Sequence, residues 1–486
     1  MNRSNIWIHF TLAAVLVVFA AVIGQIDRWR VSLKNSEATP SQAQDGSQRD
    51  VPSTPEILVR FTSGTSLLTI RAIAASNNDY MLDEFEEISN LVTIDDLDNA
   101  DAATVAAQYA AMAEVEYAEV NFQIKLEDPV AQTVSDTQTA ELPAGAPSDP
   151  LFAGQWALNN SGLDGGLERA DIDAIRAWET THGSEEVVVA VLDSGVDYNH
   201  PDLKANIWTR PAKIGRYYDD ELGSYEDERG FDATNGNGEP SHAKGHGIAM
   251  SDPMDDNGHG THCAGIIGAE GDNNEGIAGV NWRVQIMPLK FMGRSGYGNV
   301  NDAIEAINYA IDRKTNGVNL RIISASFGSA TNSKALRDAI KAAGDAGILF
   351  VAAAGNDSSN NDRWPHYPSN YDLPNLISVA ALDRNDRLAS FSNYGAKSVH
   401  VAAPGKAILS TWLGGGYREA SGTSMAAPYV AGTAALIIAN QPNISLKALR
   451  DRLLGSADEI ETINGKVATS SRVCAANALG MIVKGH

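Results

Sequence analysis

Five short apolar runs, separated by segments of helical periodicity, constrain the fold of this chain more than any other feature. Apolar residues in the intervening segments 299–314 and 333–346 repeat with the period of a helix. Strands that are apolar on both faces and alternate with helices predict an α/β fold, a doubly wound, mostly parallel sheet covered by helices on both faces. The five runs are EVVVAVLDSG (186–195), VQIMPLKF (284–291), LRIISASFG (320–328), GILFVAAAGN (347–356) and LISVAAL (376–382).

The large domain comprises residues 149–486. The chain before it changes composition several times. Residues 1–26 contain a long apolar run and are interpreted either as a cleaved signal peptide or as an N-terminal anchor. Residues 27–54 and 128–148 are polar and predict linkers. Residues 55–127 predict a small α+β domain of the ferredoxin-like kind. Its expected elements are strands at 56–61, 91–97 and 115–127 and a helix at 101–115.

Charge and cysteine content exclude some functions. The net charge of −24 argues against binding to nucleic acid, which requires a basic surface. The only two cysteines, Cys263 and Cys474, form no disulfide scaffold, and free thiols are favoured over a single bridge between them. His259 and His262 are three residues apart, but the HExxH pattern is absent, so a zinc site is not expected.

Four polar residues lie at predicted strand ends or at the start of an apolar helix. They are found in VLDSG (Asp193), GHGTHCAG (His259), AAGN (Asn356) and SGTSMAAPYVAG (Ser424). Asp and Asn are also common in turns, and a serine is a common helix N-cap. The carboxyl ends of parallel strands, however, form the usual binding edge of such a sheet. Together the four supply a nucleophile, a base, an orienting acid and an oxyanion donor.

These stretches resemble the subtilisin-like serine proteases, the subtilase family, over about residues 149–480. The order Asp, His, Ser along the chain is the order found in subtilisin. The implied activity is that of a serine endopeptidase that works through an acyl-enzyme. The implied roles are Ser424 as nucleophile, His259 as general base and then acid, Asp193 as orienting acid and Asn356 as oxyanion donor.

The resemblance also implies how substrate binds. A peptide is expected to add as a strand between SGYG (295–298) and SFG (326–328), with mainly main-chain recognition and broad specificity. His366 is expected at the base of the first specificity pocket, where it limits large apolar side chains. His262 is expected to be structural and Cys263 to lie beneath the site. The implied substrate-binding residues are Ser295, Gly296, Tyr297, Gly298, Ser326, Phe327, Gly328, Ala353, Ala354, Gly355 and His366.

The small domain, residues 55–127, resembles a subtilase propeptide, which assists folding and inhibits the enzyme. The chain is then a zymogen that cleaves itself between Leu126 and Asp149. A permanent second domain is the alternative. The expected localisation is export to the extracellular space or periplasm, or anchoring to the membrane by residues 6–26 if that segment is not cleaved.

Acidic loops near the predicted site suit calcium. Residues 217–256 are dense in Asp, Glu, Asn and Gly, which offer the hard oxygen ligands that Ca²⁺ prefers. Asp252 and Asp256 precede His259, and Asp202 with the loop 271–279 resembles a family calcium site. A structural Ca²⁺ is therefore expected, without an organic cofactor; a solvated acidic loop is the alternative.

Two other functions remain open. A peptide ligase on the same scaffold would share the acyl-enzyme and would differ by excluding water. A catalytically silent binding or adhesion protein would lack the serine or the histidine, and both are present. The expected partners are protein or peptide substrates and the chain's own propeptide.

Overall fold

The structure is a computed structural model that describes residues 56–126, 142–219, 223–234 and 249–481. All of these residues belong to one compact unit, residues 54–486. The predicted signal peptide or anchor, the first linker and most of the second linker lie outside the described residues. Within the described part of the chain, no helix is long and apolar enough to cross a membrane.

A nine-stranded sheet forms the centre of the large domain. Its strand order is β19-β20-β16-β15-β14-β13-β6-β11-β9, and all neighbouring pairs are parallel except β19 with β20. The predicted doubly wound, mostly parallel sheet is therefore confirmed. The strands are β6 (Gly183–Asp193), β9 (Phe231–Asp232), β11 (Arg283–Lys290), β13 (Leu320–Ala325), β14 (Leu349–Ala353), β15 (Leu376–Leu382), β16 (Val401–Pro404), β19 (Asp458–Glu459) and β20 (Ser471–Arg472).

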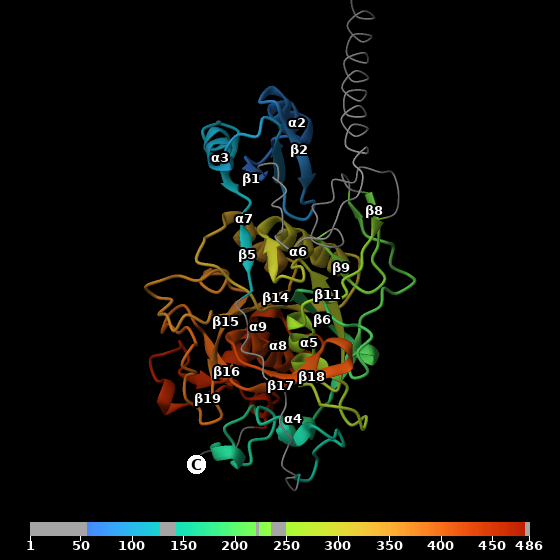
Figure 1. Cartoon of the computed structure of the whole chain (residues 1–486), viewed down its shortest axis with the longest axis vertical. Coiled ribbons are helices and arrows are strands. Elements are labelled where there is room, and N and C mark those ends of the chain that lie inside the picture. Colours follow the sequence, from blue (N-terminus) through green and yellow to red (C-terminus); the bar gives the residue numbers. More distant parts are fainter. Residues whose placement is uncertain (1–55, 127–141, 220–222, 235–248, 482–486) are drawn as a thin grey trace, which may run out of the picture. The chain divides into compact units, whose positions relative to one another are not determined.

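Helices cover both faces of this sheet (Figure 1), as the unbroken apolar runs require. Along β6, Val187, Val189 and Val191 pack into one core, whereas Val188 and its alternate neighbours pack into the other. The first core contains α4 (Ala174–Trp178), α5 (His259–Gly268), α8 (Thr423–Asn440), α9 (Leu446–Gly455) and α10 (Ala475–Ala478). The second core contains α6 (Val300–Thr315) and α7 (Lys334–Asp345).

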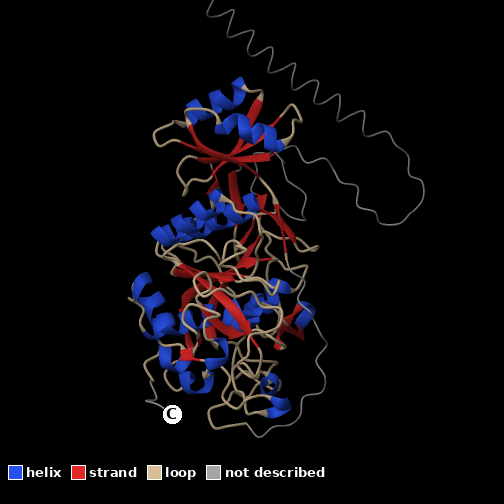
Figure 2. Cartoon of the chain, turned by 90° about the vertical axis from the view of Figure 1, so that its left-hand side faces the viewer, coloured by secondary structure: helices blue, strands red, loops and turns tan. Residues whose placement is uncertain are grey.

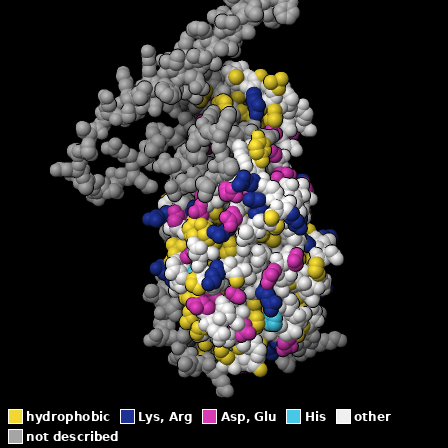
Figure 3. All heavy atoms as spheres, turned by 90° about the vertical axis from the view of Figure 1, so that its right-hand side faces the viewer, with side chains coloured by type: hydrophobic (Ala, Val, Ile, Leu, Met, Phe, Trp, Pro, Cys, Tyr) yellow, Lys and Arg dark blue, Asp and Glu magenta, His cyan; other side chains and the backbone are white. Residues whose placement is uncertain are grey.

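Short strands lie outside the main sheet. They form a hairpin of β17 (Ile408–Trp412) and β18 (Gly416–Ala420), a three-stranded sheet of β7 (Tyr218–Asp219), β8 (Gly223–Glu226) and β10 (Ala249–Met250), and a pair of β5 (Gln123–Lys125) and β12 (Tyr297–Asn299). On the face of the molecule in Figure 3, acidic and basic side chains are interspersed. The net charge of −24 is thus not gathered into a single acidic patch on that face.

The small domain has the βαββαβ order of a ferredoxin-like fold, as predicted. Its sheet has the order β2-β3-β1-β4 with every pair antiparallel, and its two helices lie on one face (Figure 2). Its elements are β1 (Glu56–Phe61), α2 (Leu67–Ser76), β2 (Asp79–Glu84), β3 (Leu91–Asp96), α3 (Ala102–Ala110) and β4 (Val115–Val120).

Two details of this domain differ from the prediction. The helix α2 and the strand β2 were not predicted, although Ser66 caps α2 by accepting a hydrogen bond from the Thr69 amide at 3.2 Å. The predicted strand 115–127 is two strands, because the chain leaves the small sheet after Val120 and β5 pairs instead with β12 of the large domain. That change of partner places the end of the small domain on the large domain.

Candidate active site

The carboxyl ends of three adjacent strands bring the predicted residues together. Strand β6 ends at Asp193, and its neighbour β13 is followed by the segment 326–328. The next strand, β14, is followed by 354–356, which ends at Asn356. The strand order reverses around β6, because β11 lies on one side of it and β13 on the other. Such a reversal is the usual position of a binding site in an open α/β sheet.

Asp193 and His259 form a buried pair. Nδ1 of His259 lies 2.7 Å from Oδ1 and 2.9 Å from Oδ2 of Asp193, and both side chains are fully buried. His259 is the first residue of α5, and a Cβ added at Gly260 would collide with the Gly195 carbonyl. The glycine thus lets the start of α5 pack directly against the chain that follows β6.

The electrostatics of this pair favour a protonated imidazole. Burial by itself lowers the pKa of His259, but the charge of Asp193 and its hydrogen bond outweigh that effect. The net result is a pKa of His259 above 6.5. His259 is therefore oriented by its Nδ1 atom and is suited to accept a proton on Nε2, which has no hydrogen-bond partner among the described residues.

Ser424 is the second residue of α8, at an N-terminus where free amide groups favour negative charge. Its hydroxyl donates to the Ser326 carbonyl at 3.1 Å rather than to His259. The Sγ atom of Cys263, one turn after His259 in α5, lies 3.5 Å from the Ser424 carbonyl, so the starts of α5 and α8 adjoin. Catalytic hydrogen bonds are often loose in the absence of substrate, and rotation about χ1 would redirect the hydroxyl.

The Asn356 side chain is held by the residue before Ser424. Its Oδ1 accepts hydrogen bonds from the Thr423 amide at 2.8 Å and the Thr423 hydroxyl at 3.0 Å. The same hydroxyl accepts a hydrogen bond from the Gly355 amide at 3.0 Å. The Nδ2 atom therefore lies on the Gly422 side, 3.3 Å from where a Cβ of that residue would be. Sequence analysis missed Thr423, since only the tertiary contact reveals what fixes the amide.

Two neighbours expected to be non-catalytic are deeply buried. Both cysteines are free and buried, and burial raises the pKa of the Cys263 thiol well above its usual value of 9.0. A thiol that remains protonated is a poor nucleophile. Burial lowers the pKa of His262 to about 3, and its Nε2 lies 3.1 Å and 3.0 Å from the carbonyls of Ile408 and Arg418. His262 thus joins α5 to the β17–β18 hairpin.

The predicted substrate segments flank these residues. Strand β12 pairs antiparallel with β5, with Tyr297 opposite Lys125 and Gly298 opposite Ile124. The Leu126 amide continues the ladder by donating to the Gly296 carbonyl at 2.7 Å. Ser295 lies just before this ladder. The chain's own segment thus occupies the edge that was predicted to bind a peptide.

His366 lies between the other two predicted segments. A Cβ at Gly328 would collide with its ring, and a Cβ at Gly355 would lie 3.0 Å from it. The side chains of Phe327, Ala353 and Ala354 are buried beside these glycines. The ring therefore lies between segments 326–328 and 353–355, and its role at the base of a pocket stays a prediction.

The predicted calcium ligands differ in their contacts. Asp202 lies against the loop 271–279, as expected, and accepts hydrogen bonds at 2.9 Å from both the Asn273 amide group and the Ile277 amide. Burial raises the pKa of Asp202 to about 7, because a charged carboxylate is disfavoured away from water. A cation bound there would offset the cost of ionising this carboxyl group. Asp256 instead forms an ion pair with Lys290 at 2.8 Å. The ammonium group already neutralises that carboxylate, so Asp256 does not fit a calcium ligand, and its predicted partner Asp252 accepts from the Tyr198 hydroxyl at 2.8 Å.

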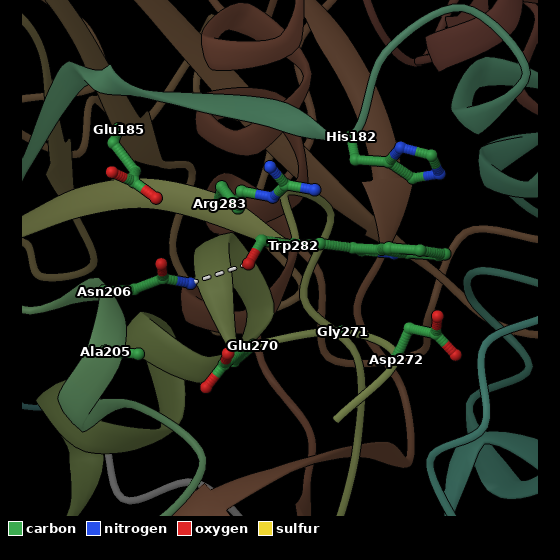
Figure 4. A pocket seen from close by; sticks show the side chains of 9 residues that line it. All are labelled: His182, Glu185, Ala205, Asn206, Glu270, Gly271, Asp272, Trp282 and Arg283. Carbon is green, nitrogen blue, oxygen red and sulfur yellow. Dashed lines mark hydrogen bonds between the residues drawn. The ribbon is translucent and has the colours of Figure 1, made fainter. Parts of the chain in front are cut away.

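A polar hollow of about 580 Å³ lies elsewhere (Figure 4). It is lined by Glu185 near the start of β6 and by Arg283 at the start of β11, so it lies at the opposite end of the strands from Asp193. The ring centroids of His182 and Trp282 are 3.9 Å apart within it. This hollow contains none of the predicted catalytic residues.

Comparisons with known proteins agree with this geometry. Residues 184–475 match the model of the Subtilase family. The chain is 37% identical over 313 residues to the thermophilic serine proteinase of Bacillus sp. (strain AK1), covering 64% of this chain and 66% of that protein. It is 35% identical over 333 residues to halolysin of Haloferax mediterranei, covering 68% of this chain and 54% of halolysin.

A solved structure, described as proteases from Pseudoalteromonas arctica, is also similar. The TM-score is 0.56 at 29% identity, covering 69% of this chain and 99% of that chain. The chain spans from 18% to 66% of the length of the first curated relatives that it matches.

Proposed function

The chain belongs to the subtilase family, and from this membership and the geometry of the site we propose that it is a serine endopeptidase made as a self-processed zymogen. The observation that carries the catalytic part is the pairing of His259 Nδ1 with Asp193 at 2.7 Å, beside the α8 N-terminus that carries Ser424. The reaction is hydrolysis of a peptide bond through an acyl-enzyme.

Each of these residues then has a defined task. The Ser424 hydroxyl turns from the Ser326 carbonyl toward His259 and loses its proton to Nε2 as Oγ attacks the substrate carbonyl. Asp193 stabilises the imidazolium that results, which its effect on the pKa of His259 already supports. The imidazolium then gives the proton to the leaving amine.

The developing oxyanion needs donors that are already in place. The Nδ2 atom of Asn356 and the Ser424 backbone amide at the start of α8 are the proposed donors. Thr423 acts as a positioning residue, because it holds Oδ1 of Asn356 and so determines where Nδ2 is directed.

We further propose that the small domain is an inhibitory propeptide. The antiparallel pairing of β5 with β12 supports this, because a substrate is expected to form the same ladder. A second contact involves Glu119 of β4, whose carboxylate accepts hydrogen bonds from the Lys334 amide at 2.9 Å and the Ala335 amide at 3.2 Å at the start of α7. The Tyr117 hydroxyl also donates to Asp338 of α7 at 2.7 Å. Processing is proposed between Leu126 and Asp149.

The proposal also covers substrate specificity, export and calcium binding. A ladder made of main-chain groups tolerates many side chains, so specificity is proposed to be broad, with His366 limiting large apolar groups. Residues 1–26 are proposed to direct export or to anchor the protein. Asp202 and the loop 271–279 are proposed to bind a structural Ca²⁺.

The test compares the full chain with Ser424→Ala by intact mass and by labelling with a fluorophosphonate probe. We expect the normal chain to be cut between Leu126 and Asp149 and to react with the probe, and the variant to do neither. A normal chain that stays full length but reacts with the probe would reject self-processing alone. A normal chain that stays full length and does not react would reject the serine peptidase.

A further inference from the structure

Three buried carboxylates meet where the small domain contacts the large one. Asp83 belongs to β2 of the small domain, whereas Asp219 lies on β7 and Glu305 on α6 of the large domain. One oxygen atom of each carboxylate lies within 4.8 Å of the other two. The three residues are only 3%, 0% and 5% exposed. Carboxylate oxygens that lie this close together and away from water form a set that a cation could bind.

Glu305 offers a buried oxygen atom that is open to a cation. Its Oε1 accepts a hydrogen bond from the Tyr217 hydroxyl at 2.8 Å, but its buried Oε2 has no hydrogen-bond partner among the described residues. A buried carboxylate oxygen without a hydrogen-bond partner is costly, and a cation bound to Oε2 would offset that cost.

The neighbouring contacts show that this place is a domain junction. Asn308, one turn after Glu305 on α6, accepts a hydrogen bond from the Glu87 amide at 2.9 Å and donates to the Glu86 carboxylate at 2.7 Å. Both glutamates lie in the connection between β2 and β3 of the small domain.

We propose that Asp83, Asp219 and Glu305 bind a Ca²⁺ ion that links the small domain to the large domain. Calcium takes oxygen ligands at about 2.3–2.6 Å, so ligands on opposite sides of it are about 4.6–5.2 Å apart. Three oxygens that lie within 4.8 Å of one another are therefore close enough together to bind one such ion. The all-oxygen ligand set favours Ca²⁺ over Zn²⁺, which prefers nitrogen and sulfur.

This site would control how firmly the small domain is held. One ligand of the three, Asp83, comes from the small domain, so departure of that domain would remove a ligand from the site. Calcium binding and docking of the small domain are thereby linked. If the small domain is an inhibitory propeptide, calcium would also affect its release, and this part of the inference rests on the proposed function. Binding of the ion does not depend on that function.

The test uses the full chain carrying Ser424→Ala, so that self-cleavage cannot alter the sample. After removal of metal with a chelator, CaCl₂ is titrated calorimetrically into this chain and into the same chain with Asp83→Asn. We expect Asp83→Asn to lose one bound Ca²⁺, or to bind it at least about tenfold more weakly. It should also lose part of the rise in thermal midpoint that calcium produces.

Two matched variants make the result specific. Glu116→Gln removes an exposed carboxylate of the small domain and should leave calcium binding unchanged. Asp202→Asn tests the separate loop site, and its effect should add to that of Asp83→Asn. Near-UV circular dichroism checks that each variant is folded, and Asp219→Asn replaces Asp83→Asn if the latter is not.

Equal calcium stoichiometry and an equal thermal gain in Asp83→Asn and Glu116→Gln would overturn the proposal. In that case shared protons would neutralise the cluster, and docking would depend on pH without depending on calcium. Because these measurements need no proteolysis, they stand even if the fluorophosphonate experiment rejects the serine peptidase.

Discussion

The substitution Thr423→Val tests whether the oxyanion donor must be held in place. The Thr423 hydroxyl donates to Oδ1 of Asn356 at 3.0 Å and accepts from the Gly355 amide at 3.0 Å. Valine has nearly the same shape but removes both hydrogen bonds. The Thr423 backbone amide still donates to Oδ1 at 2.8 Å, so the Asn356 amide is loosened rather than released.

The size of the effect follows from these contacts. A single hydrogen bond contributes about 0.5–1.5 kcal/mol net, and about 1.4 kcal/mol corresponds to a tenfold change in rate. We therefore expect kcat to fall about two- to tenfold in Thr423→Val, since one of the two bonds to Oδ1 is lost. Complete removal of the donor in Asn356→Ala should cost more, roughly 10²- to 10³-fold. KM should change little, because the oxyanion forms as the substrate carbonyl is attacked and is absent from the bound substrate.

The assay is steady-state hydrolysis of a peptide p-nitroanilide by processed enzyme, with Thr423→Ser as the matched control. Serine keeps the hydroxyl and should restore most of kcat. The Gly355 amide is buried and loses its acceptor in Thr423→Val, so that variant should also be less stable by about 1–3 kcal/mol and must be assayed well below its thermal midpoint. The reasoning fails if Thr423→Ser is as slow as Thr423→Val, or if valine raises KM and leaves kcat unchanged.

Three further predictions concern the surrounding residues. The neutral form of His259 is the proposed base, and its pKa is raised, so kcat/KM should rise with pH through a midpoint above 6.5. Asp193→Asn should shift that midpoint down and reduce kcat by about 10⁴-fold; an unshifted pH profile would contradict the role of Asp193. Cys263→Ala should keep kcat and lower only the thermal midpoint, because the thiol is buried and protonated, and a large loss of kcat in the folded variant would show that the sulfur takes part. His366→Gly should widen cleavage after large apolar residues in a peptide library, and an unchanged cleavage profile would show that the ring does not line the pocket.

Local patterns in the sequence determined the central sheet and the identity of the proposed catalytic residues. The apolar runs predicted strands β6, β11, β13, β14 and β15, because a strand buried on both faces needs an unbroken apolar run. Asp193 and Asn356 were placed correctly because they lie at or just after strand ends. The carboxyl ends of neighbouring parallel strands necessarily meet at one edge of a sheet.

Contacts between distant segments could be decided only by the tertiary structure. The pairing of β5 with β12, the hold of Thr423 on Asn356 and the ion pair of Asp256 with Lys290 join segments separated along the chain by 34 or more residues. The acidic cluster likewise joins Asp83 to a strand and a helix of another domain. Local periodicity reports which face of an element is buried, whereas a partner, a charge neighbour or a shared ion depends on which faces the fold brings together. The sequence alone therefore determined which residues are proposed to carry the chemistry, and the tertiary structure decided how they are held and what covers them.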